Sequence, residues 1–377
     1  MPDARCPETM LAGLVTGRIA PPRALDFLAA ALAAARAHGL VALVHERLRA
    51  TCWQDLSESA RQLWWRAASA DAAAALRRDL HLRETLDLLA EAGVHPLIIK
   101  GAALAQTHYP SPGLRPRGDS DLWITDGDRI TLDRTLLGAG YEIPLGIDGD
   151  LIRHQTSYVR RFGDCGFALV YDAHWRISNR AAVVHSKALD YTFCASRAMA
   201  VKALGPNARA LADEDALLLA CVHLVGHHAQ EQRLIWLYDI HLLVEAMDGS
   251  CFRGFATLAE ESGFAAVCKD VIRRSAGYFD TRSTDAAAWC EEPESVGGAA
   301  VPSIRLGYAT ASDVLWSNLR ALPSWSQRIG YVVQTAWPSA SYMTRRYAID
   351  RPWKLPYYYL KRLVCGLAKL GRRPGAA

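Results

Sequence analysis

The sequence predicts an α+β fold in which a small mixed β-sheet lies between two helical regions. Residues 1–92 are rich in Ala, Leu and Arg, and their apolar positions recur with the period of a helix. Residues 93–200 contain short apolar segments separated by glycine turns, which is typical of strands. From residue 201 the spacing becomes helical again. We therefore expect three regions: N-terminal helices over 1–92, an α/β core over 93–200, and acceptor-binding C-terminal helices over 201–377.

The N-terminal region should consist of several helices. Apolar residues mark one helix face over residues 25–32 and another over 40–48. Ser57 or Ser59 is suited to cap long helices over residues 57–89, since a serine hydroxyl can accept a hydrogen bond from a free N–H in the first turn.

The central region should alternate strands with turns and one helix. Gly163 to Gly166 is a suitable hairpin turn, so the two strands that flank it are expected to pair. The expected strands cover residues 97–100, 119–124, 156–159 and 167–175, and the expected helix covers residues 131–138.

The C-terminal region should return to helices, with apolar ones over residues 216–226 and 234–246 and a loop over 282–298. The end of the chain is rich in tryptophan, tyrosine and basic residues. The basic cluster has two interpretations, a solvated helix face with a frayed tail or a contact with an anionic substrate. Its members are Arg345, Arg346, Arg351, Lys354, Lys361, Arg362, Lys369, Arg372 and Arg373.

Composition narrows the class of protein. The 377 residues, 51% hydrophobic and 22% charged, fit a globular protein of two or three domains. The net charge of +4 is too small to indicate nucleic-acid binding. Nine scattered cysteines without a CxxC pair argue against a disulfide framework and a zinc ribbon. No signal peptide is evident and no apolar run approaches the ~20 residues of a membrane span, so we expect a cytoplasmic protein.

Acidic residues in the central region suggest a metal site. Asp119 and Asp121 are two positions apart on an expected strand, so they should project from the same face. Asp172 lies on the 167–175 strand and joins them if the two strands are neighbours. Carboxylate oxygens suit Mg2+, although surface carboxylates are the alternative interpretation. His174 shares a strand face with Asp172. It either supports the residues that bind the metal or is a structural histidine.

Basic and glycine residues around the first central strand suggest a phosphate site. Lys100 ends an apolar strand and needs an anionic partner, either a phosphate or one of the three aspartates. Gly101 permits close backbone approach at a helix start, where free N–H groups can bind phosphate. Arg115 and Arg117, just before the aspartates, could bind a triphosphate or remain solvated.

Three residues of the C-terminal region could line an acceptor site: His223, Trp236 and Asp239. Simple helix packing is the alternative interpretation for Trp236. His223 and His227 have the HxxxH spacing of zinc proteases, but the glutamate of that motif is absent, so we favour acceptor-pocket or core histidines.

The quoted motifs resemble the nucleotidyltransferase superfamily of the DNA polymerase β type. Its members carry a Gly-Ser turn, an Asp-x-Asp strand and a third Asp on a later strand, which match Gly101, Asp119, Asp121 and Asp172 here. The Lys-Gly turn resembles an uncharacterised bacterial branch found near lasso peptide and polysaccharide gene clusters. Two departures stand out: Ala102 replaces the serine, and the interval from Gly101 to Asp119 is longer than usual.

The resemblance implies an enzyme that moves an NMP from an NTP to a small-molecule, sugar or peptide acceptor and releases pyrophosphate. It implies two Mg2+ ions held by Asp119, Asp121 and Asp172, with Asp172 as a general base, and ATP is the favoured donor. Lys100, Gly101 and Ala102 would stabilise the phosphates. The alternative is a catalytically silent relative that binds a nucleotide or a peptide, and Ala102 is its main support. The lack of P-loop and kinase motifs argues against a kinase.

Overall fold

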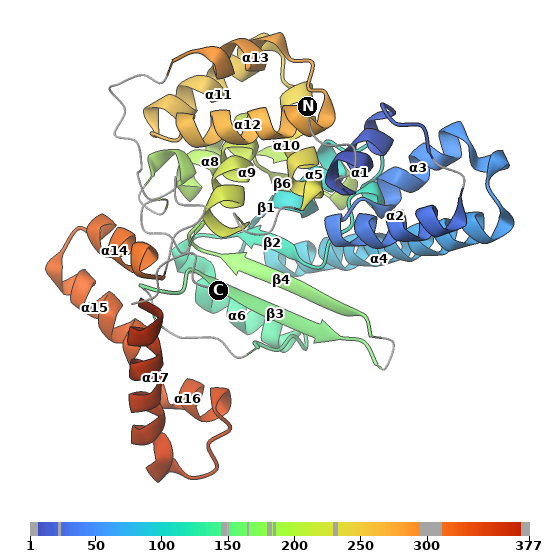
Figure 1. Cartoon of the computed structure of the whole chain (residues 1–377). Coiled ribbons are helices and arrows are strands. Elements are labelled where there is room, and N and C mark those ends of the chain that lie inside the picture. Colours follow the sequence, from blue (N-terminus) through green and yellow to red (C-terminus); the bar gives the residue numbers. More distant parts are fainter. Residues whose placement is uncertain are drawn as a thin grey trace.

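The computed structural model describes residues 7–370 except 22–23, 145–148, 150, 164–165, 179–182, 184–185, 229–232 and 294–310. Within these residues a six-stranded mixed sheet is flanked by helices (Figure 1). This architecture confirms the predicted α+β fold.

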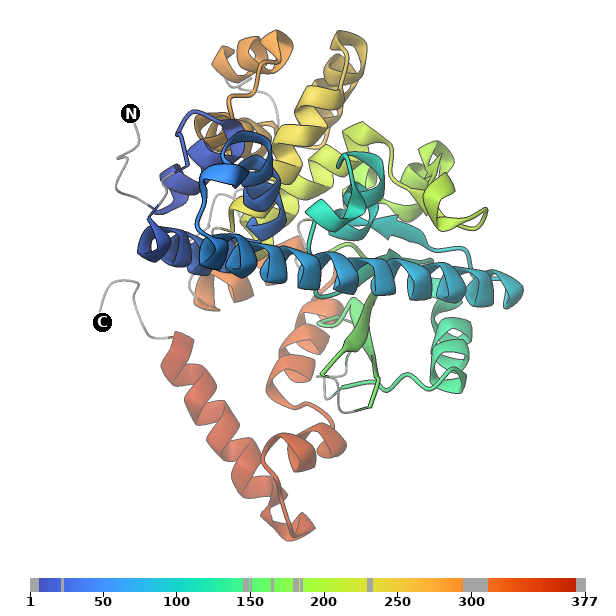
Figure 2. The ribbon, with the colours of Figure 1, turned by 90° about the vertical axis from the view of Figure 1, so that its right-hand side faces the viewer.

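The first helices form one side of the molecule: α1 (Pro7–Thr16), α2 (Leu25–His38), α3 (Val41–Thr51) and α4 (Glu58–Glu91). The expected serine cap is Ser57, whose Oγ accepts a hydrogen bond from the Ala60 N–H at 3.3 Å. From this cap α4 continues for 34 residues and crosses the molecule beside the sheet (Figure 2).

The sheet has the order β3-β4-β2-β1-β6-β5, with parallel pairing of β2 with β4 and of β1 with β6. The sequence predicted the first four strands and the β3–β4 hairpin. It did not reveal β5 and β6, because each spans only two residues and so has no readable alternation. The strands are β1 (Leu97–Ile99), β2 (Ser120–Trp123), β3 (Gln155–Arg161), β4 (Ala168–His174), β5 (Met199–Ala200) and β6 (Arg209–Ala210).

Further helices surround this sheet. The helix expected over 131–138 is α6, and α9 and α10 contain the two apolar helices expected after residue 201. The helices are α5 (Lys100–Thr107), α6 (Arg129–Gly138), α8 (Tyr191–Arg197), α9 (Asp213–His228), α10 (Leu234–Ala246), α11 (Gly249–Glu261), α12 (Ala265–Phe279) and α13 (Thr284–Glu291). The division of the chain into three regions stays a prediction.

The prediction of a loop over residues 282–298 is wrong for the first half of this range, which forms α13. Ser283 caps this helix by accepting a hydrogen bond from the Ala286 N–H at 3.3 Å, and Trp289 is buried against Phe252 and Phe255. A short helix whose packing depends on distant aromatic rings leaves little periodicity in the sequence. Residues 294–298 lie outside the described residues.

Alternate residues of the central strands enter two hydrophobic cores. Ile98 and Leu122 pack in one core with residues of α4 such as Leu86. Ile99 and Trp123 pack in the other core, with the N-terminal and C-terminal helices. Full burial of one such side chain stabilises the fold by about 1.5–3 kcal/mol, so the register of these strands is well defined.

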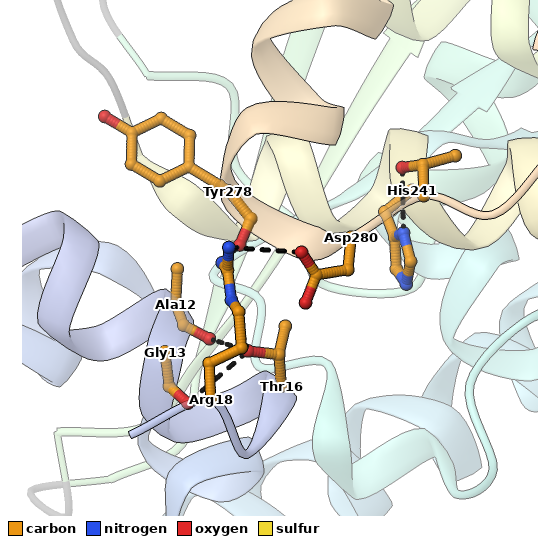
Figure 3. A network of polar contacts seen from close by, with 8 residues as sticks. Ala12, Gly13, Thr16, Arg18, His241, Tyr278 and Asp280 are labelled. Atoms are coloured by element: carbon orange, nitrogen blue, oxygen red, sulfur yellow. Dashed lines mark hydrogen bonds and ion pairs between the residues drawn. The ribbon is translucent and has the colours of Figure 1, made fainter. Parts of the chain in front are cut away.

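A polar contact connects the segment just after α1 to the end of α12 (Figure 3). The Arg18 guanidinium donates to the Tyr278 carbonyl oxygen and forms an ion pair with Asp280 at 3.1 Å. On the other side of Asp280, His241 Nδ1 lies 3.1 Å from Thr281 Oγ1. Since Arg18 and Asp280 are both solvent-exposed, the ion pair contributes little to stability.

Residues 311–370 project from the rest of the molecule, and we call them the C-terminal arm (Figures 1 and 2). A small core of Tyr342, Met343, Ile349 and Tyr359 lies in the second half of the arm. Its helices are α14 (Ala311–Ala321), α15 (Trp325–Ala336), α16 (Ala340–Arg346) and α17 (Leu355–Leu370). Among the described residues, none of the helices is both long and apolar enough to cross a bilayer.

Candidate functional site

A cavity of about 710 Å3 lies where α5, β1, β2 and β4 meet α2, α4, α9 and α10. Eleven of the twelve residues that the sequence singled out line its walls, and His174 lies behind one of them. The eleven are Lys100, Gly101, Ala102, Arg115, Arg117, Asp119, Asp121, Asp172, His223, Trp236 and Asp239. The structure therefore brings residues from the central and C-terminal regions to one place.

The strand-to-helix turn positions Lys100. The strand ends at Ile99, one residue earlier than expected, and Lys100 begins α5 with a φ of 56°. This left-handed conformation strains a residue with a long side chain by about 1–3 kcal/mol. The ammonium Nζ lies 2.7 Å from Asp121 Oδ1, which confirms that Lys100 finds an anionic partner among the aspartates.

The strand register brings two of the carboxylates together. Asp121 in β2 is paired with Asp172 in the parallel neighbour β4. Ser157 in β3 is paired with Asp172 on its other side and donates its Oγ–H to Asp172 Oδ1 at 2.5 Å. Asp119 lies one residue before β2 begins, where its side chain is exposed on the cavity wall.

Asp121 is held in its ionised form. Burial opposes the charge, but the nearby Lys100 ammonium and a hydrogen bond from His174 keep the pKa of Asp121 well below its usual range. His174 Nε2 lies 2.8 Å from Asp121 Oδ1. Because this carboxylate accepts the bond, His174 donates an Nε2–H and fixes the orientation of Asp121.

Asp119 is in the opposite situation. Its partly desolvated position, followed by repulsion from Asp121 and Asp172, raises the pKa of Asp119, and the Lys100 ammonium only partly offsets these effects. Three carboxylates around one cavity therefore carry more negative charge than the neighbouring ammonium neutralises. A further cation beside Asp119 would relieve the repulsion that raises its pKa.

Arg115 connects the central region to α10. Its Nε and Nη2 donate to the two oxygens of Asp239 at 2.8 and 2.7 Å, and Tyr109 donates to Asp239 Oδ1 at 2.7 Å. Arg115 and Asp239 are both buried, so the alternative of a solvated Arg115 is wrong. A Cβ at Gly101 would lie 2.9 Å from Arg115 Nη2, which explains why glycine follows Lys100.

Arg117 is also buried rather than solvated. Its side chain is 2% exposed and forms an ion pair with Asp79 of α4, while Nε lies 3.4 Å from Ser120 Oγ. The remaining nitrogen, Nη1, has no hydrogen-bond acceptor among the described residues. Buried guanidinium nitrogens are normally satisfied, so Nη1 is an unpaired buried donor among the described residues, in a side chain that lines the cavity.

The helical walls contain residues that the sequence reasoning missed. Arg36 from α2 and Asp71 from α4 line the cavity, and burial raises the pKa of Asp71. Nothing local in the sequence indicates them, because both belong to ordinary helix patterns. Ser157 could have been found from the hairpin, since the pairing around the turn places it opposite Asp172. The side chain of His227 lies outside the described residues.

The carboxylates of Asp119, Asp121 and Asp172 are chemically suited to a divalent cation. Carboxylate oxygens are ligands that Mg2+ prefers. Among the described residues, however, no group of three His, Cys, Asp or Glu side chains is arranged as a metal site. In the structure Lys100 and His174 contact Asp121 Oδ1, and Ser157 contacts Asp172 Oδ1.

A family model described as "Uncharacterised nucleotidyltransferase" matches residues 28–279. The chain belongs to this nucleotidyltransferase family. The matched residues begin in α2 and end with α12, so they include every wall of the cavity and stop before the C-terminal arm. Membership confirms the resemblance to nucleotidyltransferases. No curated protein matches the chain.

Proposed function

We propose that this cavity is the active site of a Mg2+-dependent nucleotidyltransferase. The enzyme would move a nucleoside monophosphate from an NTP, with ATP favoured, to a hydroxyl or phosphate of a small-molecule, sugar or peptide acceptor. The observation that carries the proposal is the convergence of Asp119, Asp121 and Asp172 with the Lys100–Gly101 turn on one cavity. Family membership supports nucleotidyl transfer in general.

The turn and the start of α5 would bind the phosphates of the nucleotide. The first N–H groups of a helix have no acceptor within the helix, and at α5 they belong to Lys100, Gly101 and Ala102. The guanidinium of Arg117, which also lines the cavity, would add positive charge near the phosphates. Because these donors are backbone atoms or a fixed guanidinium, the missing serine at Ala102 removes one contact rather than the site.

Asp119, Asp121 and Asp172 would hold the metal. When bound there, Mg2+ would neutralise phosphate charge and lower the pKa of the acceptor hydroxyl. His174 would keep the Asp121 carboxylate ionised and oriented, as it does in the structure. Lys100 would move from Asp121 to a phosphate oxygen.

The reaction would be an in-line displacement at the α-phosphorus. The acceptor oxygen forms a bond to phosphorus, the bond to the bridging oxygen of the β-phosphate breaks, and pyrophosphate leaves. Asp172 would take the acceptor proton, because Ser157 occupies only its Oδ1 and leaves the other oxygen free to accept. Catalysis would consist mainly of positioning and charge stabilisation.

The acceptor would bind between the turn and the C-terminal helices. His223 of α9 and Trp236 of α10 line that wall of the cavity. The volume of about 710 Å3 lies within the range of sites that take drug-sized ligands. A peptide acceptor would agree with the gene-cluster context of the resembling proteins, natural-product tailoring beside lasso peptide genes. We expect the compartment to be the cytoplasm.

A silent nucleotide- or peptide-binding protein is the alternative. It is favoured by the Lys100–Asp121 ion pair, which places a built-in cation on one of the carboxylates needed for catalysis. Such a protein would bind a nucleotide or a peptide without turnover.

Calorimetric titration of each NTP with Mg2+, combined with pyrophosphate release in the presence of candidate acceptors, tests the proposal. The informative variant is Asp119→Asn, because its exposed side chain can change without loss of the fold. Asp126→Asn is the matched control, an exposed acidic residue that does not line the cavity. Binding and turnover that disappear only in Asp119→Asn support the enzyme. NTP binding without turnover favours a silent nucleotide-binding relative, whereas no NTP binding to the folded protein refutes the enzyme and favours the silent peptide-binding relative.

A further inference from the structure

The C-terminal arm exposes apolar side chains in regular rows. On α15 the residues Trp325, Ile329, Val332 and Val333 are 76%, 62%, 44% and 54% exposed. Their spacing of four, seven and eight residues places them along one face of the helix. A row of this kind is normally buried against a partner, because the hydrophobic effect disfavours its exposure to water.

The second long helix of the arm repeats the pattern. On α17 the residues Tyr357, Leu360 and Val364 follow a spacing of three and seven and are each more than half exposed. Trp353, just before this helix, is 71% exposed. The two helices are connected, since Arg362 of α17 donates to the Thr335 carbonyl oxygen of α15 at 3.0 Å.

The arm is also strongly basic. Residues 311–370 contain nine Lys and Arg against two Asp, a net charge of +7, whereas the whole chain carries only +4. The preceding residues are therefore together net acidic, and the basic character is concentrated in the arm. Two of the cations lie beside exposed tryptophans: Arg328 is 5.0 Å from the centroid of the Trp325 ring, and Lys354 is 5.8 Å from the centroid of the Trp353 ring.

We propose that the C-terminal arm binds the surface of an anionic lipid bilayer. Amphipathic helices with Trp and aliphatic residues on one face and Lys and Arg beside them lie in the membrane interface, with the apolar face among the acyl chains. The positive charge of the arm complements anionic headgroups. This function is separate from nucleotidyl transfer, and the arm lies outside the residues matched by the family model.

Nucleic acid is the other anionic surface that the arm could meet, but the exposed side chains favour lipid. Single-stranded nucleic acid binds through rings on which the bases stack. Ile329, Val332, Val333, Leu360 and Val364 offer no ring, and they form the continuous part of both rows.

Vesicle co-sedimentation of the full chain tests the proposal. We expect binding to phosphatidylcholine vesicles that contain phosphatidylglycerol, little binding to phosphatidylcholine alone, and weaker binding at high salt. The variant Trp325→Ser/Ile329→Ser should weaken binding to the anionic vesicles roughly tenfold or more, because it removes two apolar side chains that would enter the bilayer. Trp65→Ser is the matched control, since Trp65 is 57% exposed on α4, outside the arm.

Retention of the wild-type circular dichroism and urea midpoint by both variants shows that they are folded. The proposal is overturned by equal binding to neutral and anionic vesicles, by no binding, or by equal loss in the control variant. Binding of a single-stranded RNA in place of vesicles overturns it in favour of nucleic acid. Formation of a dimer that protects Trp325 from quenching, without vesicle binding, overturns it in favour of a second copy of this chain.

Discussion

Replacement of Asp239 by Asn should destabilise the protein strongly. Asp239 receives two hydrogen bonds from Arg115 at 2.7 and 2.8 Å and one from Tyr109 at 2.7 Å, and both members of the ion pair are buried. The Asn side chain has nearly the same shape but no charge, so a buried guanidinium remains without its counter-charge. Removal of one partner from a buried ion pair costs about 3–5 kcal/mol, a large part of the stability of a typical domain.

Urea unfolding followed by tryptophan fluorescence measures this loss. The control is Glu46→Gln, which removes the exposed Arg49–Glu46 pair at 3.7 Å and should leave the midpoint almost unchanged. A further variant, Arg115→Met/Asp239→Leu, removes both charges and should recover much of the stability, since apolar replacement of a buried pair is often neutral. A midpoint of Asp239→Asn within error of the wild type would refute this account of the Arg115 contacts.

Three further predictions follow from the same region and its neighbours. Gly101→Ala should lower the urea midpoint, because the new Cβ would push Arg115 away from Asp239. Alanine is usually about 1 kcal/mol more favourable than glycine in a helix, so a raised midpoint would contradict the clash. Asp119→Asn should raise the melting temperature at neutral pH and not in acid. The pKa of Asp119 is higher in the folded than in the unfolded state, so this carboxyl group destabilises the fold only where it is ionised. An equal gain in melting temperature at both pH values would count against this prediction. Burial lowers the pKa of His241, so its stabilising effect is present above the unfolded pKa of 6.5 and is lost as the pH falls. His241→Gln should therefore lose less stability than the wild type between neutral pH and about pH 5, and parallel melting curves would disprove this.

The sequence predicts local features of the site well. The alternation of side chains along β2 and β4 can be recognised from short sequence segments. It placed Asp121, Asp172 and His174 on faces that the structure brings together. The hairpin turn gave the direction of β4 relative to β3. These features depend on neighbours in the chain, for which periodicity is a sufficient guide.

The ion pairs of the site could not be predicted in this way. Arg115 and Asp239 are 124 residues apart, and Arg117 and Asp79 are 38 apart, so their pairing depends on how helices pack across the sheet. The sequence shows an arginine in a polar loop, for which solvation is the ordinary expectation. Only the tertiary structure reveals that this loop is covered by α4 and α10.

The geometry of Lys100 suggests how the site responds to its ligands. A glycine would adopt the φ of 56° without strain, but it would leave Asp121 with His174 as its main support. A phosphate that draws the Lys100 ammonium away has the same effect, because it leaves a buried carboxylate without its cation. That loss is offset if a second cation arrives with the phosphate. In the proposed enzyme, the site would therefore bind a nucleotide together with its divalent cation better than either alone, and Lys100 would make the two events interdependent.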